Sequence, residues 1–204
     1  LVFTLLLPTI LFAQDSTQSK LSFEADFRFR VEQDWNSKKS DGTTRDDRTR
    51  LRYMARVGLT YEHNHWASFG IRLRTGAPNK QQDPNLTLGD GFKEFGTLPI
   101  DFEKIYAKIK MDWLTAWVGK NTFPFEKQNE LFWSNHVYPE GISVSGAFKL
   151  NEAQTQSLTI NAGHFIISSN GKSLSSDSYF QGLQIVPSLF NNKLKLYPSL
   201  YFTN

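Results

Sequence analysis

Hydrophobic and polar residues alternate strictly over three stretches in the first third of the chain, at residues 21–32, 48–62 and 67–76. In the first stretch the apolar positions are Leu21, Phe23, Ala25, Phe27, Phe29 and Val31. Successive side chains of a β-strand point to opposite faces, so this alternation is typical of a strand with one apolar and one polar face. The pattern therefore predicts three long amphipathic strands.

Further strands follow with less regular alternation, and no helical periodicity competes with them after residue 20. We predict them near residues 102–111, 115–121, 142–150, 156–167, 178–188 and 193–202. The sequence does not assign which side chains of 115–121 point to which face.

The predicted connections alternate between short and long. Short turns are expected near His63-Asn64, Asp112-Trp113, 151–154 and 191–192, and longer loops near 36–47, 77–99, 122–141 and 168–177. This alternation is typical of outer-membrane barrels, whose tilted strands need about 9–11 residues to cross the bilayer. We therefore predict an all-β fold, a transmembrane antiparallel up-and-down β-barrel.

Composition narrows the choice of class. The mean hydropathy of −0.43 excludes a bundle of membrane helices, each of which needs about 20 apolar residues. The absence of cysteine excludes a disulfide scaffold and thiolate metal sites. A net charge of +3 is too small to indicate nucleic acid, and the aromatic residues lie opposite the basic face instead of among it. We expect no nucleic-acid partner.

The N-terminal residues 1–13 form an uncharged apolar run that ends in Ala13. This run is typical of a secretory signal peptide, and the alternative is a buried N-terminal strand. We therefore divide the chain into a signal peptide at 1–13 and a partial outer-membrane β-barrel at 14–204. Export and the barrel pattern together predict a location in the cell outer membrane.

Arginine is confined to one part of the chain, and eight of the nine arginines in the sequence lie in the first three strands at polar positions. These are Arg28, Arg30, Arg48, Arg50, Arg52, Arg56, Arg72 and Arg74. An arginine facing lipid at the bilayer midplane costs about 2–4 kcal/mol, so the apolar face should meet lipid and the arginine face should line the lumen. Basic linings select anions, and we predict these eight residues as pore-lining, anion-binding groups.

Two points stay open in this interpretation. The arginines could instead form a structural network of ion pairs with Glu24, Asp26, Glu32 and Glu62, and both roles can coexist. The aromatic loop 122–141 either folds inward and narrows the pore or packs outside on the rim.

Enzyme signatures are missing: the sequence has no GxSxG, no HExxH and no phosphate-binding glycine loop. We therefore expect no enzyme activity, no cofactor and no metal. The alternatives are a barrel enzyme of the lipase type built around His164 near Ser168 and Ser169, an adhesin that functions through its loops, and a secreted soluble β-sandwich that binds acidic ligands.

Four strings carry a family resemblance: RTRLRYMARVGLTYE (48–62), GIRLRTGAPN (70–79), WVGKNTFPF (117–125) and LFWSNHVYPEGI (131–142). With them the chain resembles the putative porin family of Gram-negative outer membranes and, more loosely, the phosphate-selective porins. The resemblance implies a channel of roughly 16 strands that is often trimeric. Its partners would be membrane lipid, small anionic solutes of the phosphate type and a possible homotrimer.

About nine strands are predicted here, and the sequence lacks a closing strand with a terminal aromatic residue. An open sheet would leave unpaired edges that a bilayer does not tolerate. We therefore expect this chain to be the N-terminal part of a longer barrel that allows passive diffusion of small solutes.

Overall fold

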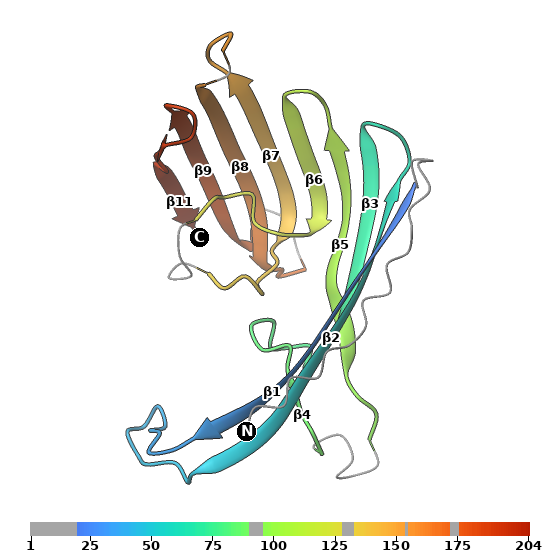
Figure 1. Ribbon diagram of the computed structural model, residues 1–204, viewed down its shortest axis with the longest axis vertical. Helices are drawn as coiled ribbons and strands as arrows, with labels where there is room; N and C mark the ends of the chain where they lie inside the picture. Colours follow the sequence, from blue (N-terminus) through green and yellow to red (C-terminus); the bar gives the residue numbers. More distant parts are fainter. Residues whose placement is uncertain (1–19, 90–95, 128–132, 154, 172–175) are drawn as a thin grey trace.

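A computed structural model describes residues 20–89, 96–127, 133–153, 155–171 and 176–204 (Figure 1). The predicted signal peptide at 1–13 lies outside these residues. The described chain is built from β-strands joined by turns and loops. Over these ranges we find no helix with the length and apolar character needed to cross a bilayer.

In the part of the chain that the structure describes, eleven strands form one antiparallel sheet. They are β1 (Leu21–Asp34), β2 (Arg48–Glu62), β3 (Ala67–Thr75), β4 (Leu86–Thr87), β5 (Ile100–Lys110), β6 (Leu114–Lys120), β7 (Glu140–Lys149), β8 (Ser157–Ser168), β9 (Ser178–Leu189), β10 (Leu194–Lys195) and β11 (Ser199–Thr203).

The strands run up and down in sequence order, β1-β2-β3-β5-β6-β7-β8-β9-β10. The short β4 pairs with β2 beyond the end of β3, and β11 pairs with β9. In the described part of the chain the sheet is not closed. The predicted all-β, antiparallel up-and-down architecture is confirmed, and it agrees with a barrel wall.

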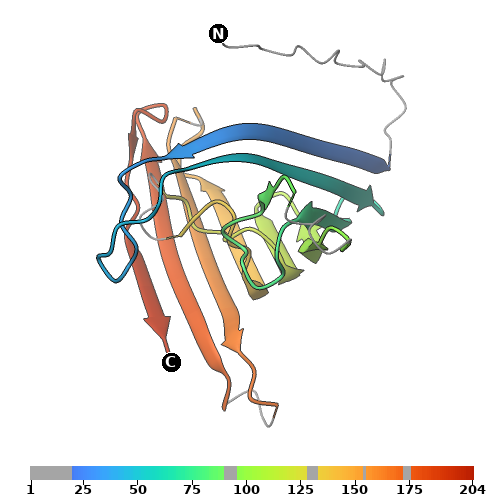
Figure 2. The same cartoon turned by 90° about the horizontal axis from the view of Figure 1, so that it is seen from below.

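The sheet is strongly curved, and we call its concave side the inner face and its convex side the outer face. Figure 2 shows the described parts of the segments that join β3 to β5 and β6 to β7 on the concave side. Connections alternate as predicted, with short turns at 63–66, 111–113, 150–156 and 190–193. The longer loops are 35–47, 76–99, 121–139 and 169–177.

One strand prediction and one loop prediction need correction. The strand expected over 193–202 is divided into β10 and β11, with Pro198 between them. Proline has no N–H to give to a strand ladder, so it interrupts the pairing there. The two-residue β4 lies within a segment predicted as loop, because pairing with Arg52 and Tyr53 of β2 is a tertiary contact.

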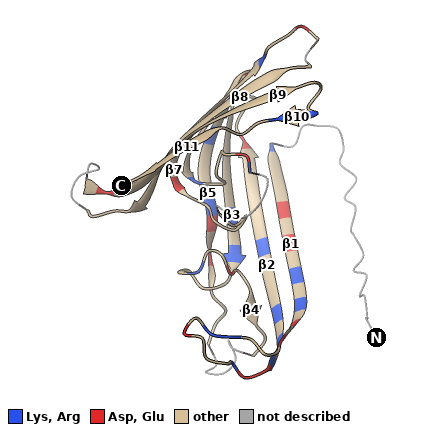
Figure 3. Ribbon diagram, turned by 90° about the vertical axis from the view of Figure 1, so that its left-hand side faces the viewer, with Lys and Arg blue, Asp and Glu red and all other residues tan. Residues whose placement is uncertain are grey.

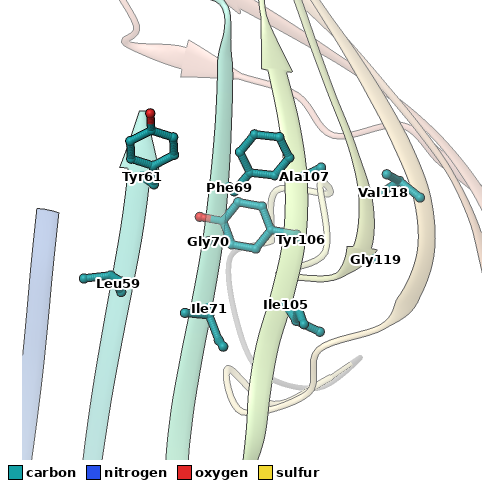
Figure 4. Close-up of a pocket in the computed structure, with 10 residues that line it drawn as sticks. All are labelled: Leu59, Tyr61, Phe69, Gly70, Ile71, Ile105, Tyr106, Ala107, Val118 and Gly119. Atoms are coloured by element: carbon teal, nitrogen blue, oxygen red, sulfur yellow. The ribbon is translucent and has the colours of Figure 1, made fainter. Parts of the chain in front are cut away.

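Over β1 to β5 the outer face carries a row of apolar, exposed side chains. Phe23, Leu59, Ile71 and Ile105 lie side by side across β1, β2, β3 and β5, and each is exposed. Figure 4 shows a shallow apolar groove on this part of the sheet. Continuous exposed apolar surface of this kind marks contact with lipid or with another protein.

The strand β6, whose facing the sequence left unassigned, can now be placed. Val118 lies between Ala107 and Ile142 on the outer face. Trp117 lies between Lys108 and Ser143 and is buried on the inner face. The alternation was ambiguous because this strand carries an apolar ring inward.

Candidate functional site

The eight predicted arginines occupy the inner-face positions of β1, β2 and β3, where some lie directly opposite one another. In the strand register Arg30 lies opposite Arg52, and Arg56 lies opposite Arg74. Like charges opposed across strands are unfavourable, so groups of opposite charge or with lone pairs must separate them. The positions of those groups define the site.

At the end of the β1–β2 hairpin next to the 35–47 loop, the arginines form ion pairs with carboxylates of β1. Arg48 Nε lies 2.6 Å from Asp34 Oδ2, and Arg50 Nη2 lies 2.8 Å from Glu32 Oε2 and 3.2 Å from Asp34 Oδ2. Arg30 also pairs with Glu32. The side chains of these three arginines are 26–38% exposed, so water still reaches them.

Arg52 fastens the 76–99 loop to the inner face. Its Nη2 donates to Asp83 Oδ1 and Oδ2 at 2.8 and 2.7 Å and to the carbonyl of Asn85 at 2.9 Å. Arg28 Nη2 donates to Asn85 Oδ1 at 2.9 Å. Burial alone would raise the pKa of Asp83, but hydrogen bonds from Arg52 and Asn85 hold it below its usual value.

Arg74 acts on the start of the same loop. It donates to the backbone carbonyls of Thr75, Ala77 and Lys80 at 3.1–3.3 Å and is 3% exposed. These neutral acceptors occupy its guanidinium, so Arg74 holds the turn in shape.

Glu103 lies at the centre of the network, between two arginines. Its Oε1 is 3.0 Å from Arg56 Nε and its Oε2 is 2.6 Å from Arg72 Nε, and its side chain is 1% exposed. A charge this deeply buried needs such partners, because an unpaired one would be strongly destabilising.

A β-bulge brings Glu103 to this position. Arg72 pairs with Lys104 and Leu73 pairs with Phe102, so Glu103 is an extra residue in β5. A bulge places two residues of one strand opposite one residue of its neighbour. The sequence carries a signal for it: Phe102 and Ile105 are three residues apart, and both can face outward only if one residue is added.

The 121–139 loop reaches the same arginines through its C-terminal part. Arg56 Nη2 lies 2.7 Å from His136 Nδ1, and Arg72 Nη2 donates to the Tyr138 hydroxyl at 2.6 Å. The Tyr138 ring also lies 5.1 Å from Lys104 Nζ. Burial and the nearby negative charge of Glu103 raise the pKa of Tyr138, so the phenol stays neutral.

The two loops also contact each other. The N–H of Tyr138 donates to Gln81 Oε1 at 3.0 Å. Of the two arrangements that the sequence left open for 122–141, the described residues of this loop lie on the inner face. Residues 128–132 of the loop lie outside the described residues.

Over β6 to β11 aromatic rings fill the centre of the inner face, and one ion pair, between Lys195 of β10 and Glu126 of the loop, lies beside them. The rings belong to Trp117, Phe123, Phe125, Trp133, Phe165, Phe180 and Tyr201. Three of them come from the 121–139 loop and pack on the strands, with ring centres 5.3 Å apart for Phe123–Phe165 and 5.4 Å apart for Phe125–Tyr201. We call this group the aromatic cluster.

The sequence prediction of the arginine set can be compared with these contacts. Within the described ranges, six of the eight arginines form ion pairs, and Arg28 and Arg74 bind neutral oxygens. Of the four acids predicted as partners, Glu24, Asp26 and Glu32 form ion pairs, and Glu62 forms none with the described residues. Asp34, Asp83 and Glu103 also form ion pairs and were not predicted. The pore-lining role of the eight arginines stays a prediction.

His164, the starting point of the lipase alternative, lies on the outer face. Its Nδ1 is 2.9 Å from Gln181 Nε2, and its ring lies 5.2 Å from that of Tyr179. In the described chain no hydrogen bond joins it to Ser168 or Ser169. The described residues also contain no group of three or more acidic or histidine side chains suited to a metal ion.

Comparisons with known proteins bear on this arrangement of sheet, loops and charges. The model of a family described as "Putative porin" matches residues 40–197, more than half of the chain. Neither a comparison with curated proteins nor one with solved structures gives a match.

Proposed function

Because the chain belongs to the putative porin family, we propose that it forms part of an outer-membrane channel for passive diffusion of small solutes, with a preference for anions. The antiparallel up-and-down sheet, apolar on one face and charged on the other, supports this proposal. A bilayer needs such a wall, with lipid against the apolar face and water against the polar one.

The observation that carries the proposal is the one-sided placement of arginine. All eight residues lie on the inner face, opposite exposed phenylalanine, leucine and isoleucine side chains. The opposite orientation would put several guanidinium groups in lipid, at about 2–4 kcal/mol each near the midplane.

Within this set we assign two roles by exposure. Arg30, Arg48 and Arg50 keep 26–38% of their side chains exposed, and we propose that these three meet the solute. Arg52, Arg56 and Arg72 are 10–16% exposed and bind loop residues or Glu103. Their main role is to hold the loops in place.

Carboxylates on the same face weaken the positive field, so the proposed preference for anions is modest. A guanidinium has five N–H donors, and an ion pair with one carboxylate leaves donors free for a passing anion. We propose a channel that favours small anions such as chloride or phosphate but also admits neutral solutes.

The test is the reversal potential of the full-length protein in a planar bilayer under a potassium chloride gradient. Replacing Arg30 and Arg50 together with Gln should shift this potential toward cation preference. The Lys38→Gln/Lys39→Gln variant removes the same charge from the exposed 35–47 loop and should shift it less. An unchanged potential would refute the anion role of these arginines, and the absence of any conductance would refute the channel.

A further inference from the structure

Residues 121–127, the first described part of the 121–139 loop, run from the end of β6 over the inner face to β9, where they meet one buried amide. Gln184 lies in the middle of β9 and is 1% exposed. Its Oε1 accepts a hydrogen bond from the N–H of Glu126 at 2.8 Å, and its Nε2 donates to the carbonyl of Glu126 at 2.8 Å. One side chain therefore binds both backbone groups of a single loop residue, as a neighbouring strand would.

The remaining hydrogen-bonding capacity of this amide is also used. Asn161 Nδ2 donates to Gln184 Oε1 at 3.2 Å, and Gln184 Nε2 donates to Ser199 Oγ at 3.0 Å. A primary amide offers two donors and two acceptor lone pairs, so all four are satisfied. An apolar side chain at 184 would leave the backbone groups of Glu126 without these partners, so this attachment of the loop to β9 would be lost.

The preceding loop residue docks on the same strand. An ideal Cβ placed on Gly182 would lie 2.3 Å from Cζ of Phe125, so the ring occupies space that any side chain at 182 would need. Gly182 and Gln184 are two residues apart and share the inner face of β9. Contacts at two consecutive loop residues fix the register of the loop on the strand.

We propose that Gln184 is the positioning residue that holds the first part of the 121–139 loop, around Phe125 and Glu126, on the inner face and so decides which part of the interior stays open to solute. Beneath the loop, Ser143, Asn161 and Phe165 on the inner wall are only 2–3% exposed. Solute cannot reach that wall. Along the described wall the open path runs past β1 and the start of β2, where Arg30, Arg48 and Arg50 are 26–38% exposed. This inference rests on the proposed channel function.

The experiment compares Gln184→Leu with the wild-type full-length protein. With the anchor removed, we expect a larger single-channel conductance, entry of larger neutral sugars in liposome swelling, and faster cleavage by trypsin after Lys127. The matched control is Gln181→Leu, which removes the same amide from the outer face of the same strand and does not contact the loop. It should leave all three measurements unchanged.

A second variant, Phe125→Ala, removes the loop's ring and leaves the wall intact, so it serves if Gln184→Leu does not fold. It should act in the same direction. If the wild type conducts and both variants keep its conductance, size limit and cleavage rate, the anchor proposal is wrong. If the wild type does not conduct, the channel function fails, and cleavage after Lys127 still tests whether Gln184 holds the loop.

Discussion

The inner face has two halves that hold their loops by different interactions. Over β1 to β5, arginines and carboxylates alternate, and the 76–99 loop is attached through Arg52 and Asp83. Over β6 to β11, the first part of the 121–139 loop is attached through the aromatic cluster and Gln184. The C-terminal part of this loop contacts Arg56 and Arg72 of the other half. Figure 3 shows the contrast, with charged residues gathered on β1, β2, β3 and β5, while β8 and β9 carry none.

The difference indicates that the two halves of the sheet have different roles. Charged groups can stay partly exposed to water, so the arginine half suits a hydrated path. Aromatic rings exclude water when they pack, so the other half suits a fixed inner support for a loop. Three further experiments test this comparison.

The largest effect is expected at Glu103, the most deeply buried charge of the arginine half. Glu103→Gln removes the charge that separates Arg56 from Arg72, and removing one partner of a buried ion pair costs about 3–5 kcal/mol. The free energy of unfolding in urea, measured in detergent or lipid, checks this. The matched control is Glu126→Gln, whose 3.7 Å pair with Lys195 on the inner face is exposed and should contribute about 0–1 kcal/mol. Equal effects at the two positions would contradict the central role of Glu103.

A smaller effect is expected in the aromatic half. Phe165 is 2% exposed and stacks on Trp117 with ring centres 5.8 Å apart. Phe165→Leu keeps an apolar side chain but loses ring contacts worth about 0.5–1.5 kcal/mol per pair, measured as the change in unfolding free energy. Phe23→Leu on the outer face, where Phe23 is 70% exposed, is the control and should change little. A larger loss at Phe23 would show that the cluster is not a packed core.

The smallest effect is expected from acid, and only in the arginine half. Asp83 has a pKa below its usual value of 3.8 in the folded protein, so its ion pair with Arg52 stabilises the fold above that value. The contribution is lost as the pH falls below 3.8 through the folded pKa. The difference in thermal midpoint between the wild type and Asp83→Asn should stay constant at neutral pH and shrink in acid. A difference that does not depend on pH would rule out this ion pair as its source.

The sequence predicted most of the architecture because one short-range rule governs it. Alternation assigned the faces of β1, β2 and β3, and the spacing of turn-forming residues placed the loops. A strand repeats every two residues, so one misplaced residue would invert a whole face, and the pattern is therefore a strong constraint.

The same rule could not find the groups that complete the site. Glu103 was missed because a bulge interrupts the period, and Asp83 was missed because it lies in a loop whose path no periodicity describes. Gln184 was missed because the sequence analysis selected charged side chains on the polar face, and Gln184 is a neutral inner-face residue. Each has a partner far away in sequence: Arg52 is 31 residues from Asp83, Arg56 is 47 residues from Glu103, and Glu126 is 58 residues from Gln184.

The sequence by itself determined the all-β up-and-down fold and gathered arginine on one face, since both follow from side-chain direction along a strand. Only the tertiary structure decided which arginines are exposed, which acids pair with them and where the two loops lie. Those properties depend on contacts between segments far apart in the chain, and such contacts form only when the sheet curves and brings its loops over one face.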